Sequence, residues 1–424
     1  MADDRVAAHH VPAAETAVGA GVAAKARTGL RATLQRAWWV KVLVVFVVSR
    51  VITTAIILSF ASRQASNAWT GANPNYFDFA KIWDGHWYYI IAVAGYPSEL
   101  PVTVDGHVGE SAWAFMPAYP SVVRLIMLVT GLDFAVVAVF VSVAFALGAA
   151  LMFYKLIRLV QPGSVALFAV VLFCFAPLSP ILQVSYAESM HLFLLMLALY
   201  VLVQRRYWIM LPVIAAMALT RPSGLAYALT LLLHLVYRFV TRARDPFPWS
   251  ERIAVVVAGL FSAGMGVAWL GVAWAVTGSP SAYLDTELAW RRPYIGNEEL
   301  VPFTPWIRAA EFWQGYLPLP APAAYVILGL LVAGFAAFLF SPWMKRLGVD
   351  LRFWTFSYAL YLLAVFFPQS STFRLLLPLS PAWGALAVPR SRLWRVGVLA
   401  VCLVGQWLWI YHVYALGNTF WQVP

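Results

Sequence analysis

Charged residues are scarce in this chain. Asp, Glu, Lys and Arg make up 11% of its 424 residues, whereas a soluble domain has about 25%. A soluble globule of this length needs more polar surface, and a disordered chain needs more charge, so both classes are excluded. Because 62% of the residues are hydrophobic and the mean hydropathy is +0.77, the composition predicts an all-α polytopic membrane protein.

Cysteine and several catalytic motifs are also scarce or missing. The only cysteines, Cys174 and Cys402, fall in apolar segments. They indicate buried free thiols, with no disulfide framework and no cysteine zinc site. The sequence contains no P-loop, HExxH, CxxC or GxSxG motif, which disfavours an ATP-driven pump and a membrane metalloprotease. It also shows no convincing inverted repeat, which weakens the transporter interpretation.

Continuous apolar runs such as VKVLVVFVVS favour membrane helices over the alternating strands of a barrel. We predict a disordered cytoplasmic tail over residues 1–38 and a single transmembrane domain over 39–424. About 11 spans are expected in that domain, at 39–60, 133–156, 164–182, 187–204, 207–220, 222–240, 253–277, 322–341, 353–368, 373–388 and 396–416.

The distribution of charge predicts the orientation of these spans. With the N-terminus in the cytoplasm, 20 basic residues lie on the inside and eight on the outside, as the positive-inside rule requires. The net charge of +11 is therefore a topology signal, and nucleic-acid binding is not expected. Twelve of the 18 acidic residues lie outside. Two outer segments, 61–132 and 278–321, are long, and long loops in compact proteins are usually functional.

The first outer loop contains two stretches that are rich in aromatic and aliphatic residues, 76–94 and 116–130. Both are predicted to be amphipathic helices in the membrane interface, where Trp and Tyr prefer to lie. The second stretch could instead span the membrane, although Lys155 and Arg158 would then face outward, against the charge bias.

Asp84 is the first candidate for chemistry, because it lies among aromatic residues on the predicted outer face. A carboxylate in that position could act as a general base toward a hydroxyl group. The alternative is an N-cap or an Asx-turn at Asp84-Gly85. Asp78 is a weaker candidate. The flanking residues that could contact a sugar are Trp83, His86, Trp87 and Tyr88.

Four further polar residues could contribute to a site. Arg50 lies within the first span and is either functional or paired with an acidic residue. Glu188 begins a predicted span and is either a substrate ligand or a helix cap; His191 after it is interpreted as a packed histidine. Arg221 and Arg374 lie at outer ends of spans and could bind a lipid phosphate, or simply anchor the chain at lipid headgroups.

The second outer loop mixes charged and aromatic side chains and could bind an acceptor sugar, although a solvated loop is the alternative. Its residues of interest are Asp285, Glu287, Arg291, Arg292, Glu298, Glu299, Trp290, Tyr294, Trp306 and Trp313.

Five short motifs, in order over roughly residues 40–380, give the chain a resemblance to a known family. They are Trp83-Asp84-Gly85 with Trp87-Tyr88, Phe115-Met116-Pro117-Ala118-Tyr119-Pro120 with Arg124, Ser185-Tyr186-Ala187-Glu188-Ser189, Thr220-Arg221-Pro222-Ser223-Gly224 and Arg374-Leu375-Leu376-Leu377-Pro378. Together they resemble the GT-C superfamily of membrane glycosyltransferases, and within it the PIG-V-type mannosyltransferases, which include the enzyme that adds the second mannose to GPI-anchor precursors.

The resemblance implies a GT-C-type fold and an inverting transfer of mannose at the non-cytoplasmic face. The expected donor is a polyprenyl-phosphate mannose, and the acceptor is a hydroxyl of a glycolipid or other glycan. Asp84 maps to the base. The phosphate-binding role is assigned to Arg221 and Arg374, with Arg50 as a further candidate. No metal or other cofactor is expected, and the protein is expected to be a monomer.

The sequence departs from the family in one respect. The Ala-rich basic tail and the high usage of Ala, Val and Trp are typical of a high-GC bacterium, which would place the protein in a bacterial plasma membrane. Such bacteria make no GPI anchors, so the acceptor stays open. Two other interpretations remain at this stage, a lipid or sugar transporter or flippase, and a non-catalytic scaffold subunit of the cell envelope.

Overall fold

The computed structural model describes residues 37–317, 319–369 and 371–415, and they form an all-helical protein. Within these residues the only β-pairing is an isolated bridge between Val102 and Val108. The longer helices are α2 (Trp38–Ala61), α6 (Phe134–Arg158), α8 (Glu188–Val203), α10 (Gly224–Val240), α11 (Trp249–Thr277), α15 (Ala323–Phe340), α17 (Val349–Val365) and α20 (Arg392–Trp409), which a π-helical segment, η4 (Ile410–Ala415), continues.

Shorter helices connect these elements and form much of the predicted outer side. They are α3 (Tyr76–Ala80), α4 (Asp84–Ala94), α5 (Ala118–Thr130), α7 (Gly163–Phe175), α9 (Tyr207–Ala218), α12 (Ala282–Ala289), α13 (Arg292–Ile295), α14 (Pro305–Tyr316), α16 (Pro342–Lys345), α18 (Thr372–Leu375) and α19 (Trp383–Leu386), with 3₁₀ turns η1 (Ala112–Ala114), η2 (Ser179–Gln183) and η3 (Leu377–Ala382).

Five of the described helices, α2, α6, α11, α15 and α20 with its π-helical end, are long and apolar enough to cross a membrane. They indicate an integral membrane protein. Helices α7, α8, α9 and α10 are apolar but shorter, so the total of eleven spans stays a prediction. The predicted tail over 1–38 lies almost entirely outside the described residues, and its disorder is untested.

Two predicted spans are wrong as continuous helices. Residues 164–182 form α7, which ends at Phe175, and then the 3₁₀ turn η2. Residues 373–388 form α18, η3 and α19 in succession. Pro378 and Pro381 lie within this segment, and proline removes a backbone donor and clashes with the preceding turn. The broken segment allows Arg374 to lie in a buried turn, which a straight span would not have provided.

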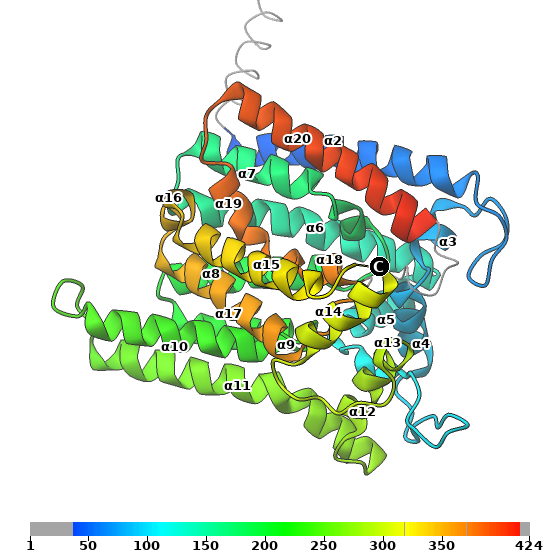
Figure 1. The fold of residues 1–424 in the computed structure, drawn as a ribbon. Helices are drawn as coiled ribbons and strands as arrows, with labels where there is room; N and C mark the ends of the chain where they lie inside the picture. The colour runs from blue at the N-terminus through cyan, green and yellow to red at the C-terminus, as the bar shows by residue number, and fades with distance from the viewer. Residues whose placement is uncertain (1–36, 318, 370, 416–424) are drawn as a thin grey trace, which may run out of the picture.

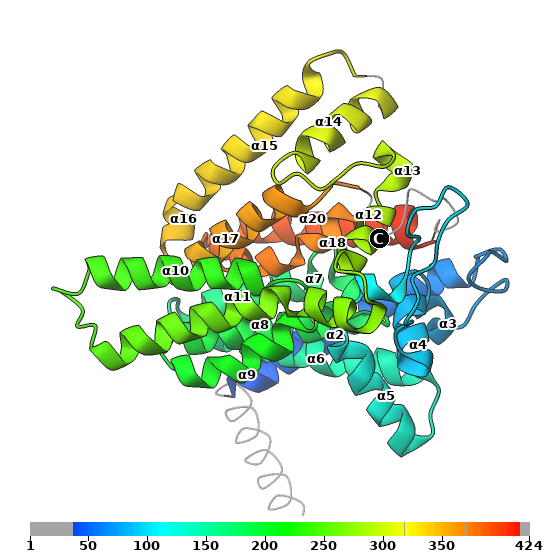
Figure 2. The ribbon, with the colours of Figure 1, turned by 90° about the horizontal axis from the view of Figure 1, so that it is seen from below.

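The helices pack around an apolar core in which α6, α7 and α8 are the most buried elements. Helices α2 and α20 lie on one side of this core, and the antiparallel pair α10 and α11 lies on the other (Figure 1). Helices α14 and α15 diverge from the remaining bundle (Figure 2), and α15 buries little of its surface.

Two glycines set the approach of α10 to α11. A Cβ atom added at Gly224 would lie 2.7 Å from the Cα of Gly266. A Cβ atom at Gly266 would in turn lie 2.8 Å from the backbone nitrogen of Leu225. Real Cβ atoms do not tolerate such distances, so both positions require glycine. This contact fixes the start of α10 at Gly224, three residues after Arg221.

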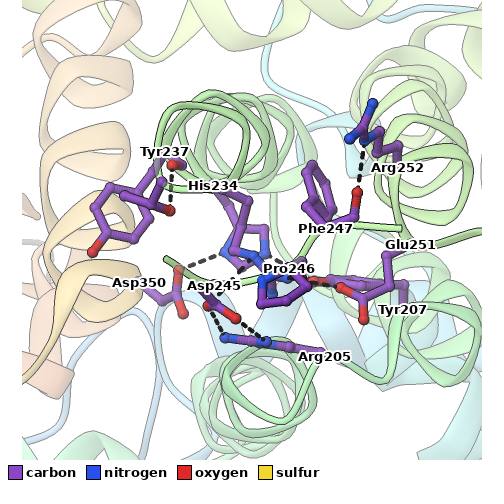
Figure 3. Close-up of polar contacts among 12 residues, drawn as sticks. Arg205, Tyr207, His234, Tyr237, Asp245, Pro246, Phe247, Glu251, Arg252 and Asp350 are labelled. Carbon is purple, nitrogen blue, oxygen red and sulfur yellow. Dashed lines mark hydrogen bonds and ion pairs between the residues drawn. The ribbon is translucent and has the colours of Figure 1, made fainter. Parts of the chain in front are cut away.

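A polar cluster joins α9, α10, α11 and α17 at the end that the charge distribution assigns to the cytoplasm (Figure 3). His234 Nε2 contacts the hydroxyl of Tyr207 at 3.0 Å, and His234 Nδ1 contacts Asp350 at 2.7 Å. Arg238 Nη2 donates to Glu251 at 3.0 Å. Because these groups are paired with one another across four helices, we interpret the cluster as a structural tie.

Candidate functional site

The predicted amphipathic stretch 76–94 is interrupted immediately before Asp84. Helix α3 ends at Ala80, and α4 begins at Asp84. Trp83, in the gap, has φ 58° and ψ −127°, a region that bulky side chains rarely adopt and that stores strain, often at functional sites. The break places the Asp84 carboxylate at the N-terminus of α4, where the helix dipole favours negative charge.

Glu188 occupies the equivalent position on α8, as its first residue. The two motifs lie side by side. The backbone nitrogen of Ser185 donates to the carbonyl of Ala80 at 3.1 Å, and a Cβ atom at Gly85 would lie 3.4 Å from the Ser185 Cβ. Two helix N-termini therefore present two carboxylates to the same region.

The two arginines come from broken segments at the ends of other helices. Arg221 lies in the turn between α9 and α10, and this turn is tied to α5 by a hydrogen bond of 2.9 Å from Ala118 N to Leu219 O. Arg374 lies on α18, which Tyr358 of α17 holds by donating to the carbonyl of Leu375 at 2.9 Å.

These four side chains form one buried group, called the charge cluster: Asp84, Glu188, Arg221 and Arg374. Arg374 Nη1 donates a short hydrogen bond to Asp84 Oδ2, and Arg374 Nε lies 3.6 Å from Glu188 Oε1. Arg221 contacts Glu188 Oε1 through Nη2 at 2.8 Å and Asp84 Oδ2 through Nη1 at 3.9 Å. With two carboxylates and two guanidinium groups, the cluster is neutral, which is what burial of charge requires.

Burial alone would lower the pKa of Arg221. The neighbouring groups, with the Glu188 carboxylate contributing most, outweigh this effect and raise the pKa above the ordinary value. The guanidinium therefore remains charged. Asp84 and Glu188 are only 6% and 4% exposed, so their charge is compensated by the arginines and the helix termini more than by water.

The charge cluster lines a cavity of about 900 Å³, which is large enough for a sugar and part of a lipid chain. The predicted residues Trp83, His86 and Trp87 belong to its wall. The rest of the wall is mostly apolar and includes Val267 and Leu270 of α11 and Leu362 and Val365 of α17.

Three predicted site residues lie elsewhere. The Arg50 guanidinium donates to the carbonyls of Cys174 and Ser179, each at 2.8 Å, and it is not part of the cavity wall. Its donors are taken up by backbone carbonyls around the end of α7, and its role as a phosphate ligand stays a prediction. Asp78 lies at the surface, 3.9 Å from Lys81. Tyr88 is buried outside the cavity wall, against Phe115 and Tyr119.

The structure also brings residues of the second outer loop to the cavity, including some of those that the sequence indicated for a possible acceptor sugar, and Tyr283, which the sequence did not indicate. Glu287 and Tyr283 of α12 and the adjoining Trp290 and Arg291 line it, as does His191, which the sequence had indicated as a packed histidine. The helical signal for Arg291 is weak, because α12 ends at Ala289 and Arg291 lies in the turn after it.

Comparison with known proteins identifies no family. No protein-family profile matches the chain, and no curated protein matches its sequence. Among solved structures, it is similar to an Archaeoglobus fulgidus oligosaccharyltransferase tethered with an acceptor peptide, at 12% identity and a TM-score of 0.44. It is also similar to AglB, the archaeal oligosaccharyltransferase from Archaeoglobus fulgidus, in complex with an inhibitory peptide and a dolichol-phosphate, at 14% identity and the same TM-score. Each comparison covers 92% of this chain but only 56% and 57% of the respective structures.

Proposed function

We propose that the protein is an inverting membrane glycosyltransferase. It transfers mannose from a polyprenyl-phosphate mannose to a hydroxyl of a glycolipid or related acceptor at the non-cytoplasmic face of the membrane. The observation that carries this proposal is the convergence of Asp84, Glu188, Arg221 and Arg374, from four separate motifs, on the wall of one cavity. The choice of mannose rests on the motif resemblance.

In the proposed reaction the acceptor oxygen forms a bond to the anomeric carbon of the donor, and the bond from that carbon to the phosphate oxygen breaks. The electron pair leaves with the phosphate, whose charge changes from about −1 to −2. The acceptor proton goes to Asp84, as general-base catalysis requires. The total charge in the cavity is therefore unchanged by the step.

In this step Arg374 exchanges one anionic partner, Asp84, for another, the leaving phosphate. In the structure it is bonded to Asp84. When Asp84 takes the proton and becomes neutral, its hold on Arg374 weakens while the leaving phosphate gains negative charge. The guanidinium can then turn to the phosphate, which it binds better than a neutral acid. Arg221 is the second phosphate ligand, and Glu188 orients both arginines.

The test uses purified protein in lipid nanodiscs with labelled sugars on defined polyprenyl-phosphate carriers and a total lipid extract as acceptor. We expect a labelled glycolipid product from the mannosyl carrier, and transfer reduced by about a hundredfold or more in Asp84→Asn. Movement of the intact labelled lipid between leaflets, with no transfer, would instead indicate a flippase and refute the proposal.

A further inference from the structure

A second group of side chains lines the cavity, separate from the charge cluster. We call it the loop wall: Tyr283, Glu287, Trp290 and Arg291. It comes from α12 and the turn after it, in the second outer loop. None of its residues belongs to the reaction step proposed above, so its chemistry requires a separate explanation.

Glu287 is the central residue of the loop wall. Its carboxyl group interacts with the hydroxyl of Tyr283 and with the guanidinium of Arg291. Burial is the largest influence on Glu287 and raises its pKa above the ordinary range of a carboxyl group, although Arg291 opposes the shift. Glu287 lines the same cavity as the charge cluster.

Aromatic rings complete this part of the cavity. Trp87 and Trp290 lie edge to face, with centroids 5.8 Å apart, and both line the cavity. The indole nitrogen of Trp290 is buried and has no hydrogen-bond partner among the described residues. A buried donor without a partner is costly, so it would gain from a ligand oxygen. Carboxyl groups and indoles beside apolar ring faces suit a sugar, which carries hydroxyl groups on an apolar ring.

The charges lining the cavity define the kind of sugar. Four carboxyl groups, those of Asp84, Glu110, Glu188 and Glu287, face three guanidinium groups, those of Arg221, Arg291 and Arg374. The donor phosphate adds a further negative charge. Burial raises the pKa of Glu110 and of Glu287. Even if both are protonated, Asp84, Glu188 and the donor phosphate together balance the three guanidinium groups. An acceptor with an anionic group at its reacting end would therefore be an uncompensated anion, which Coulomb repulsion disfavours.

We propose that the loop wall is the acceptor subsite and that it binds a neutral sugar, with Glu287 hydrogen-bonded to acceptor hydroxyl groups and Trp87 and Trp290 against the ring. This inference rests on the proposed function, because the subsite holds an acceptor only if the protein transfers a sugar. The binding of a neutral sugar can nevertheless be measured without any transfer.

The experiment measures binding of labelled octyl mannoside, a neutral probe, and of labelled octyl phosphate, an anionic probe, to the protein in nanodiscs. Glu287→Gln is expected to weaken octyl mannoside binding about tenfold or more, while octyl phosphate binding changes less than twofold. Tyr283→Phe is a second, milder variant and should weaken octyl mannoside binding in the same direction. Asp285→Asn is the matched control, because Asp285 lies on the same helix, accepts a hydrogen bond from Ser281 at 2.6 Å and does not line the cavity.

In the transfer assay, Glu287→Gln should raise the acceptor KM about tenfold and leave the donor KM unchanged. Unchanged binding of octyl mannoside in both variants, or an equal loss of both probes in Glu287→Gln alone, would overturn the inference. Glu287-dependent binding of the neutral probe in a protein that transfers no sugar would support the subsite and refute the proposed function, so the two failures are distinguishable.

Discussion

Replacing Asp84 with asparagine tests two proposed roles of this residue, as the general base and as a competitor with the donor phosphate for the arginines. Asp84 bonds directly to Arg374 and lies 3.9 Å from Arg221. Two unit charges about 4 Å apart interact by about 4 kcal/mol at an effective dielectric constant of about 20. Any anion that binds the arginines must compete with this attraction. The Asn variant keeps the shape of the side chain and removes the competing charge.

We therefore expect Asp84→Asn to bind polyprenyl phosphate more tightly than the unmodified protein does. If about half of the Coulomb energy is recovered by the ligand, the gain is about 2 kcal/mol, or about thirtyfold in Kd. Transfer should fall by about 10² to 10⁴, which is the usual contribution of a general base. Tighter binding together with lost turnover is the signature of a base that also competes for the phosphate ligand.

The variant leaves two guanidinium groups facing one carboxylate, so some loss of stability is expected. Binding of labelled polyprenyl phosphate is therefore measured on the folded fraction after size-exclusion chromatography. Asp78→Asn is the control, because Asp78 lies at the surface in the neighbouring helix and does not line the cavity. Undiminished transfer would refute the role of Asp84 as base, and weaker phosphate binding would refute the competition.

Other variants test the remaining assignments. Arg50→Met leaves two carbonyls without their donor and should cost about 2–5 kcal/mol in unfolding experiments, with unchanged octyl phosphate binding; weaker phosphate binding would restore the residue to the site. Gly266→Ala should lower the melting temperature and transfer together, because the new methyl group meets backbone, whereas Gly264→Ala, with no atom within 4 Å, should be neutral or slightly stabilising. Asp350→Asn should cost about 1–3 kcal/mol of stability without changing the acceptor KM. Burial raises the pKa of Glu287 above 4.5 in the folded protein, so the folded state holds this proton more tightly than the unfolded state does. The stability should therefore fall as the pH rises from about 4.5 to the raised pKa. Glu287→Gln should flatten this pH dependence, and a melting temperature with the same pH profile in both proteins would contradict the assignment.

Composition and the order of charges were enough to indicate a helical membrane protein, because both are properties of the chain that need no tertiary contact. Apolar runs long enough for a bilayer must be helical. Local aromatic patterning also drew attention to Asp84, and outer-end positions to Arg221 and Arg374. The predicted spans 164–182 and 373–388 were wrong as continuous helices, because average hydropathy does not register how prolines break a helix.

The pairing of the charges was decided by the tertiary structure alone. Asp84 and Arg374 are 290 positions apart in the chain, and their contact depends on the strained turn at Trp83 and on the broken segment that carries α18. The positions of Arg50 and Glu287 were likewise decided by the tertiary structure. Arg50 was predicted to be in the site and binds backbone carbonyls, while Glu287, in a loop with several similar charges, lines the cavity. Which charged group faces a cavity depends on packing between distant segments, and that packing has no periodic or local signature in the sequence.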